Sequence, residues 1–230
     1  MMHGIDISNW QSGTNIPFAS VDFAIMKATE GNYFVDAYCD GWVQKAKANG
    51  LCWGFYHFAG ESHAAVEADW FVRNCEGYFG EGVPVLDWEG GQSVDWVNEF
   101  VQTVHNATGV WPWIYANPWR FNQGGVEANC ARWVAEYPDV ASPAFDQAEA
   151  WTPSATDGNV VAWQFCSDGY VAGCGPLDCN LYYGDAASWA LYAKGDRAAT
   201  APQPDPEPEP EGCGETVHVV KPGDTIKIAE

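Results

Sequence analysis

The sequence has 230 residues, of which 47% are hydrophobic, so it can bury one sizeable core and a small second module. Its formal net charge of −21 argues against nucleic acid as a partner, because a phosphate backbone requires clustered Lys and Arg. No apolar run approaches the ~20 residues that cross a bilayer, so no membrane insertion is expected.

The eight cysteines form no CxxC pair and no Cys and His spacing that would hold zinc. The sequence therefore predicts neither a metal site nor a cofactor. Seven cysteines precede Cys213, so at least one thiol of that region is free or pairs outside it. The group Cys166, Cys174 and Cys179 either staples a loop or is buried as plain hydrophobic residues, and the spacing decides no pairing.

Strand and helix patterns alternate along the first half of the chain. Strands are predicted at 3–7, 22–27, 51–58, 85–88 and 111–116. Helices are predicted at 35–48, 64–79 and 94–106, where apolar residues recur with helical spacing, and Ser93 is a suitable N-cap for the last of them. Beyond residue 116 the elements shorten to 129–136, 160–165 and 178–182.

Repeated strand, helix and strand units require parallel strands joined by right-handed crossovers. With this many strands in one domain, a closed or nearly closed α/β barrel is the natural arrangement. The late loss of helices predicts an incomplete TIM-like (β/α) barrel. We expect it to span residues 1–197.

The segment PVLDWEGG at 84–91 is central to the functional prediction. An extended chain sends side chains i and i+2 to the same face, so Asp87 and Glu89 point together with Cα atoms about 6.5 to 7 Å apart. Each charge disfavours ionisation of the other, and an apolar surround adds to this effect, so one carboxyl group can stay protonated and act as a general acid. The alternative is that the two acids merely end a strand in an acidic protein.

In a parallel barrel the active residues gather where the strands end at their carboxyl side. This rule collects four acids and several other polar or aromatic residues around one mouth. They are Asp6, Lys27, Glu30, Tyr56, Asp87, Glu89, Tyr115, Trp163 or Gln164, and Asp178. His57 alternates away from Tyr56 on its strand, so we expect it to be a hydrogen-bonded core histidine.

The composition changes after residue 197. Proline alternates mostly with acids, which predicts an extended acidic linker at 198–215. The segment VVKPGDTI at 219–226 resembles the opening of a LysM repeat, a small peptidoglycan-binding module. We therefore expect 216–230 to be a LysM-like stub that is cut short and does not bind glycan.

Seven ordered blocks of the chain resemble the family 25 glycoside hydrolases, the N-acetylmuramidase lysozymes often found as phage endolysins. The blocks are GIDISNWQ at 4–11, IMKATEG at 25–31, GFYHF at 54–58, PVLDWEG at 84–90, WIYAN at 113–117, WQF at 163–165 and DCNLYYG at 178–184. The resemblance implies an incomplete barrel and hydrolysis of the β-1,4 bond from N-acetylmuramic acid to N-acetylglucosamine in peptidoglycan.

The resemblance also implies roles for single residues. Glu89 matches the general acid, and Asp87 matches its partner carboxylate, which in one view orients the 2-acetamido group of the substrate in a retaining, substrate-assisted reaction. Asp6 and Asp178 match the remaining acids, with Asp178 as a direct nucleophile left open. Positions that contact sugar are matched by Tyr56, Tyr115 and Trp163, with Gln164 beside them. Lys27 and Glu30 either contact substrate or form an ion pair at the rim.

Two other classes stay open on sequence alone. One is a barrel that binds peptidoglycan or chitin without turnover, and the other is a hydrolase with chitinase-like specificity. The chain begins with neither a basic leader nor an apolar stretch of signal-peptide length. We therefore expect a monomeric phage or prophage endolysin that leaves the host cytoplasm without a signal peptide and acts on the cell wall.

Overall fold

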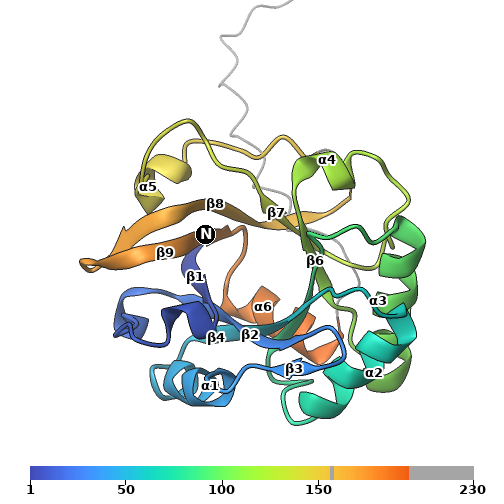
Figure 1. Ribbon diagram of the computed structural model, residues 1–230. Helices are drawn as coiled ribbons and strands as arrows, with labels where there is room; N and C mark the ends of the chain where they lie inside the picture. Colours follow the sequence, from blue (N-terminus) through green and yellow to red (C-terminus); the bar gives the residue numbers. More distant parts are fainter. Residues whose placement is uncertain (156–157, 197–230) are drawn as a thin grey trace, which may run out of the picture.

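The computed structural model describes residues 1–155 and 158–196 (Figure 1). The acidic linker expected at 198–215, the LysM-like stub expected at 216–230 and Cys213 lie outside the described residues. Among the described residues, no helix is both long and apolar enough to cross a membrane.

Eight strands form a closed barrel, and a ninth short strand lies at its edge. The barrel order is β1, β9, β8, β7, β6, β5, β4, β2, and the ring closes because β1 pairs with both β9 and β2. The strands are β1 (Met2–Ile7), β2 (Phe23–Glu30), β3 (Phe34–Val35), β4 (Cys52–Phe58), β5 (Val83–Asp87), β6 (Trp113–Ala116), β7 (Arg132–Ala135), β8 (Val160–Val171) and β9 (Cys174–Tyr182).

The predicted fold class is confirmed, and the departure from a full (β/α) barrel lies in its second half. Strands β1, β2, β4, β5, β6, β7 and β8 run parallel to their neighbours in that series. In contrast, β9 runs antiparallel between β8 and β1, because a tight hairpin and not a helix joins it to β8.

The long helices cover one side of the barrel. They are α1 (Cys39–Ala48), α2 (Ala64–Asn74) and α3 (Val94–Thr108), whereas α4 (Pro118–Phe121) and α5 (Phe145–Ala148) are single turns. The N-cap prediction at Ser93 is confirmed, since its Oγ accepts a hydrogen bond from Trp96 N. Two predicted helix limits were wrong by four residues or more.

The first helix begins at Cys39, four residues later than predicted. Residues 34–35 instead pair with the end of β2, and the Asp36 carboxylate accepts hydrogen bonds from Asn9 N and Tyr38 N. The second helix ends at Asn74 and not at Phe79, because Cys75 leaves the helical conformation and a turn follows it.

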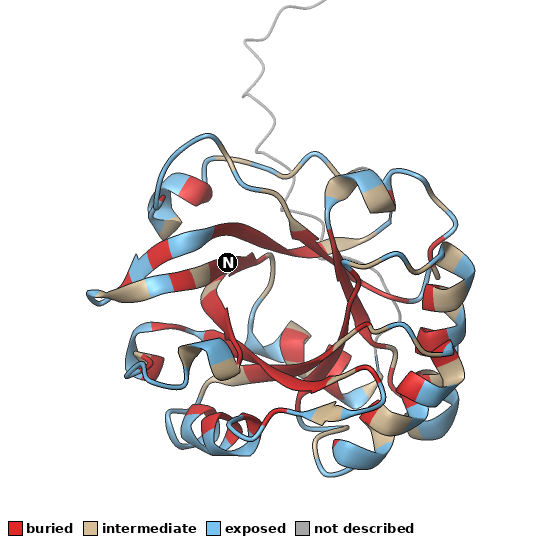
Figure 2. Ribbon diagram, viewed as in Figure 1, coloured by how far each residue is buried: buried red, intermediate tan, exposed pale blue. Residues whose placement is uncertain are grey.

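The barrel interior is filled by large aromatic side chains toward its amino end. Trp113 is fully buried there, and α6 (Ala186–Lys194) closes that end with Trp189. The indole of Trp189 packs 5.1 Å from that of Trp113 and donates a hydrogen bond to Trp53 O. Figure 2 shows the barrel strands as mostly buried.

Candidate active site

Strand pairing brings the acids of distant segments together at the carboxyl end of the barrel. Asp6 on β1 and Asp178 on β9 are direct register partners across one antiparallel pair. On the other side, Asp87 at the end of β5 lies between its register partners Phe58 and Tyr115. Glu89 follows two residues after the strand, on the exposed rim.

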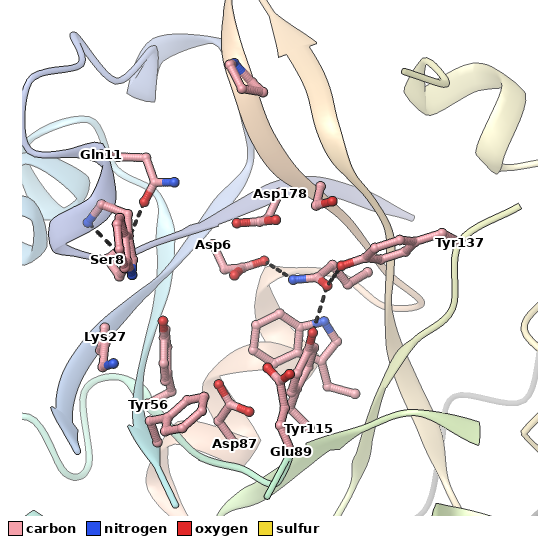
Figure 3. A pocket seen from close by; sticks show the side chains of 16 residues that line it. Asp6, Ser8, Gln11, Lys27, Tyr56, Asp87, Glu89, Tyr115, Tyr137 and Asp178 are labelled. Atoms are coloured by element: carbon pink, nitrogen blue, oxygen red, sulfur yellow. Dashed lines mark hydrogen bonds between the residues drawn. The ribbon is translucent and has the colours of Figure 1, made fainter. Parts of the chain in front are cut away.

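All four acids line one open cavity of about 410 Å³ (Figure 3). The residues expected at the mouth that do line it are Asp6, Lys27, Tyr56, Asp87, Glu89, Tyr115, Gln164 and Asp178. The expectation that residues from separate strands share one groove is therefore met by the geometry of the described residues.

Trp163 does not line this cavity. Its side chain lies on the outer face of β8, where it packs against Phe165 and donates a hydrogen bond from Nε1 to Glu136 O. Alternation along β8 then turns Gln164 inward. Glu30 also lies outside the lining and reaches the site only through Lys27, whose Nζ is 2.6 Å from Glu30 Oε2.

Asp6 is held by two amides at the back of the cavity. Its Oδ2 accepts hydrogen bonds from Gln164 Nε2 at 2.8 Å and from Asn180 Nδ2 at 2.7 Å. Burial raises the pKa of Asp6 to about 6, although both amides lower it, and the charge of Glu89 adds to the rise. Asp6 therefore changes its charge close to neutral pH.

Asp87 is a buried acid without a full set of hydrogen-bond partners. Only 7% of it is exposed, and its Oδ1 has no donor among the described residues. Burial raises the pKa of Asp87 well above its ordinary value, and the charges of Glu89 and Asp6 raise it further. Because neighbouring acids titrate as a coupled set, this part of the cavity retains a proton at neutral pH.

Asp178 completes the acidic wall. Burial raises its pKa to about 8, and the nearby charges of Asp6, Cys166 and Glu89 act in the same direction. Burial and the adjacent acids also raise the pKa values of Tyr56 and Tyr115, so both phenols stay neutral. The cavity consequently presents carboxyl and hydroxyl groups together, which suits a polyhydroxylated ligand.

Lys27 is the one cation that lines the cavity in the described residues. Its ammonium group is paired with Glu30 and lies 4.8 Å from the centre of the Phe58 ring. Burial raises the pKa of Glu30, but hydrogen bonds from Lys27 and Tyr33 outweigh burial and lower it overall. The predicted ion pair at the rim is thus present.

Arg120 supports the segment that carries Glu89. From α4 its Nη2 donates hydrogen bonds to Glu89 O at 2.7 Å and Gly90 O at 2.5 Å, while its guanidinium lies 4.7 Å from the Trp88 ring centre. These contacts fix the backbone on both sides of the Glu89 carbonyl. The sequence prediction did not include this residue.

The cavity has eight further lining residues that sequence reasoning missed. They are Ser8, Trp10, Gln11, Phe58, Trp133, Tyr137, Ser167 and Pro176. A signal existed for Ser8, Trp10 and Gln11, which fall in the first block that resembles the family, at 4–11, and come directly after β1. Tyr137 carried no such signal, because it lies in an irregular segment. It lines the cavity and donates a hydrogen bond to Gln164 Oε1.

His57 is confirmed as a core histidine. It is fully buried, with Nδ1 2.8 Å from Thr29 Oγ1 and Nε2 3.1 Å from Glu67 Oε2. Burial lowers the pKa of His57, so the ring is neutral in the folded protein. Glu67 also accepts hydrogen bonds from Gly60 N and Ser62 N, so this set fixes the loop after β4.

The chain is similar to known proteins in sequence and in fold. The family model described as Glycosyl hydrolases family 25 matches residues 5–174. Lysozyme M1 of Streptomyces globisporus is 30% identical over 213 residues, which cover 81% of this chain and 69% of that protein. Two solved structures, both with a TM-score of 0.67, are similar over most of the chain.

The first is a bacterial lysozyme from Streptomyces coelicolor, which is 29% identical and is aligned over 84% of this chain and 96% of its own. The second is a muramidase from Acremonium alcalophilum, which is 28% identical and is aligned over 85% of this chain and 100% of its own. The family match at residues 5–174 includes Asp6, Asp87 and Glu89 and ends before Asp178.

Proposed function

The chain belongs to the glycosyl hydrolases of family 25, and from this premise we propose that it cleaves peptidoglycan with Glu89 as the proton donor. Its enzyme class follows from the family and from relatives named as lysozymes and muramidases, so the protein is a peptidoglycan-hydrolysing lysozyme. The bond cleaved is the β-1,4 linkage from N-acetylmuramic acid to N-acetylglucosamine. The observation that carries the residue roles is the convergence of four acids on one open cavity.

In the proposed first step, Glu89 donates its proton to the glycosidic oxygen while the bond to the anomeric carbon breaks. Its exposed position on the rim suits contact with a bridging oxygen of a long polysaccharide. The oxygen of the substrate's own 2-acetamido group attacks the anomeric carbon, and Asp87 accepts a hydrogen bond from the acetamido N–H. In the second step the Glu89 carboxylate takes a proton from water, whose oxygen attacks the anomeric carbon, so the anomeric configuration is retained.

Two features support Asp87 as the partner of the acetamido group. Asp87 and Glu89 are both close to the end of β5, so they face the sugar from the same side, whereas a direct nucleophile attacks from the opposite side. The unpartnered Oδ1 of Asp87 is a free acceptor within the cavity wall. In the coupled set of acids, the state in which Glu89 holds the proton and Asp87 is ionised would also stabilise the positive charge that develops on the cyclised intermediate.

Asp6 and Asp178 form the opposite part of the wall, and we propose that they hold the sugar and a water molecule and keep a proton within the site. Tyr56, Tyr115, Gln164 and Lys27 would contact sugar hydroxyl groups. Trp163 is not included, because it faces away from the cavity.

We also propose, from the sequence, that residues 198–215 are a linker and 216–230 a LysM-like start. The same holds for the expected monomeric state and for an endolysin role at the bacterial cell wall. Of these, the family supports action on the wall polymer itself.

The proposal is tested with purified peptidoglycan, by measuring release of reducing ends and identifying the products by mass spectrometry. The wild-type protein should release fragments that end in N-acetylmuramic acid. Glu89→Gln should lower the rate at least about 100-fold, because it removes the proton donor at nearly constant shape. Glu99→Gln, at an exposed position on α3, is the matched control and should keep the wild-type rate.

The alternatives give different results in the same assay. Near wild-type activity of a folded Glu89→Gln protein would remove Glu89 from the mechanism. Fragments that end in N-acetylglucosamine would indicate chitinase-like specificity. Binding of peptidoglycan without any release of reducing ends would indicate a barrel that binds without turnover.

A further inference from the structure

Two cysteines face each other across the β8–β9 hairpin, next to the active-site wall. Cys166 on β8 and Cys179 on β9 are register partners. Both are thiols in the structure, and they are only 3% and 2% exposed. Figure 1 shows the two strands side by side as they extend away from the barrel.

A β-bulge places the two side chains on the same face of the hairpin. Gln164 pairs with Asn180, and the next pair is Cys166 with Cys179, so β8 advances by two residues where β9 advances by one. Gln164 and Asn180 point into the barrel, where both bind Asp6. The bulge turns Cys166 to the outer face with Cys179, and both belong to the apolar cluster outside the barrel.

Gly169 shows how close the two sulfur atoms are. A Cβ at this position would lie 2.4 Å from Cys179 Sγ and 3.0 Å from Cys166 Sγ, so both sulfurs border the same small space. Only a residue without a side chain leaves room for them. The neighbouring Cys179 thiol lowers the pKa of Cys166, which favours the Cys166 thiolate.

We infer that Cys166 and Cys179 are a redox-active pair that closes to a cross-strand disulfide and clamps the hairpin carrying Asp178. The oxidant is a small-molecule disulfide of the glutathione class. The Cys166 thiolate attacks one sulfur of the oxidant, breaks its S–S bond and releases one small thiolate, which takes the proton of Cys179. The Cys179 thiolate then attacks the Cys166 sulfur, breaks the mixed disulfide and releases the second small thiolate, which takes a proton from water, so two electrons pass to the oxidant.

The hairpin offers the reagent access by local opening. Several residues between the two cysteines are exposed, including Ser167, Asp168 and the turn at 172–173. The closed disulfide would join residues on both sides of the turn. It would therefore restrain the segment that supplies Ser167, Pro176 and Asp178 to the cavity.

The test uses the full chain, reduced, desalted and incubated with oxidised glutathione near neutral pH. Remaining thiols are alkylated in denaturant, and the protein is digested with pepsin at acid pH and mapped by mass spectrometry. We expect one linked peptide pair joining Cys166 and Cys179, lighter by two hydrogen atoms. Alkylation of both residues, a glutathione adduct without the link, or a link through Cys174 would overturn the inference.

Variants and melting temperatures give a second measurement. Cys39→Ser, at a buried thiol in α1, should leave the link intact, and Cys166→Ser should remove it. Oxidation should raise the melting temperature of the wild type by roughly 5–10 °C, reversibly on adding dithiothreitol, because the disulfide restricts the unfolded chain. Equal melting temperatures of the linked and reduced wild type would refute the inference that the disulfide clamps the hairpin. This comparison needs no variant.

Discussion

Replacing Asp6 with Asn should stabilise the protein at alkaline pH while it impairs hydrolysis. The pKa of Asp6 rises from 3.8 to about 6 on folding, chiefly through burial. A carboxyl group with a raised pKa contributes stability that is fully present below pH 3.8 and is lost as the pH rises through about 6. At about pH 8 the wild type therefore carries the cost of a buried, ionised Asp6.

The size of this cost follows from the shift. A rise of about two pKa units corresponds to about 3 kcal/mol, which Asp6→Asn should recover at about pH 8. The new side chain fits the site, because its Oδ1 can accept the hydrogen bonds that Gln164 and Asn180 donate to Asp6 Oδ2. Below about pH 4 the wild-type carboxyl group is protonated, so the variant and the wild type should then be about equally stable.

The assay is urea unfolding of both proteins at about pH 4 and about pH 8, together with reducing-end release from peptidoglycan. Asp139→Asn, at an exposed position, is the control and should change neither quantity. The reasoning is refuted if Asp6→Asn gains the same stability at both pH values, or none at about pH 8. A gain in stability with a loss of activity would mark Asp6 as a residue kept for function at the expense of the fold.

Two further substitutions test the rim of the cavity. Arg120→Gln removes the donor to Glu89 O and Gly90 O, so Glu89 should be misplaced and kcat should fall roughly tenfold to 100-fold. An unchanged kcat of the folded variant would contradict this role. The ring of Trp10 is 85% exposed at the edge of the cavity, where it can stack on a sugar. Trp10→Ala should therefore raise KM several-fold and leave the free energy of unfolding unchanged. An unchanged KM would exclude this stacking.

Local patterns in the sequence were sufficient for the first half of the barrel. Strand alternation put Asp6 at the end of β1 and Asp87 at the end of β5, and the rule that active residues follow the carboxyl ends of parallel strands gathered them. The same alternation assigned His57 to the core, away from Tyr56. These predictions succeed because side-chain direction in a strand depends only on the parity of the position.

The second half of the barrel depended on contacts between distant segments. The sequence left Trp163 and Gln164 as alternatives at the mouth, and the pairing of β8 with β7 and β9 turned Gln164 inward. The antiparallel direction of β9 follows from its hairpin connection to β8. The position of α6 over the amino end of the barrel depends on its packing against residues of distant strands.

The sequence by itself determined which acids are available and on which strand ends they lie. Only the tertiary structure decided the pKa and the hydrogen-bond partners of each acid, because burial, hydrogen bonds and neighbouring charges come from other strands. Asp6 meets Asp178 through β1–β9 pairing, and its two amide donors come from residues more than 150 positions away. No local pattern encodes such distances, since strand register and bulges are set by the packing of the whole barrel.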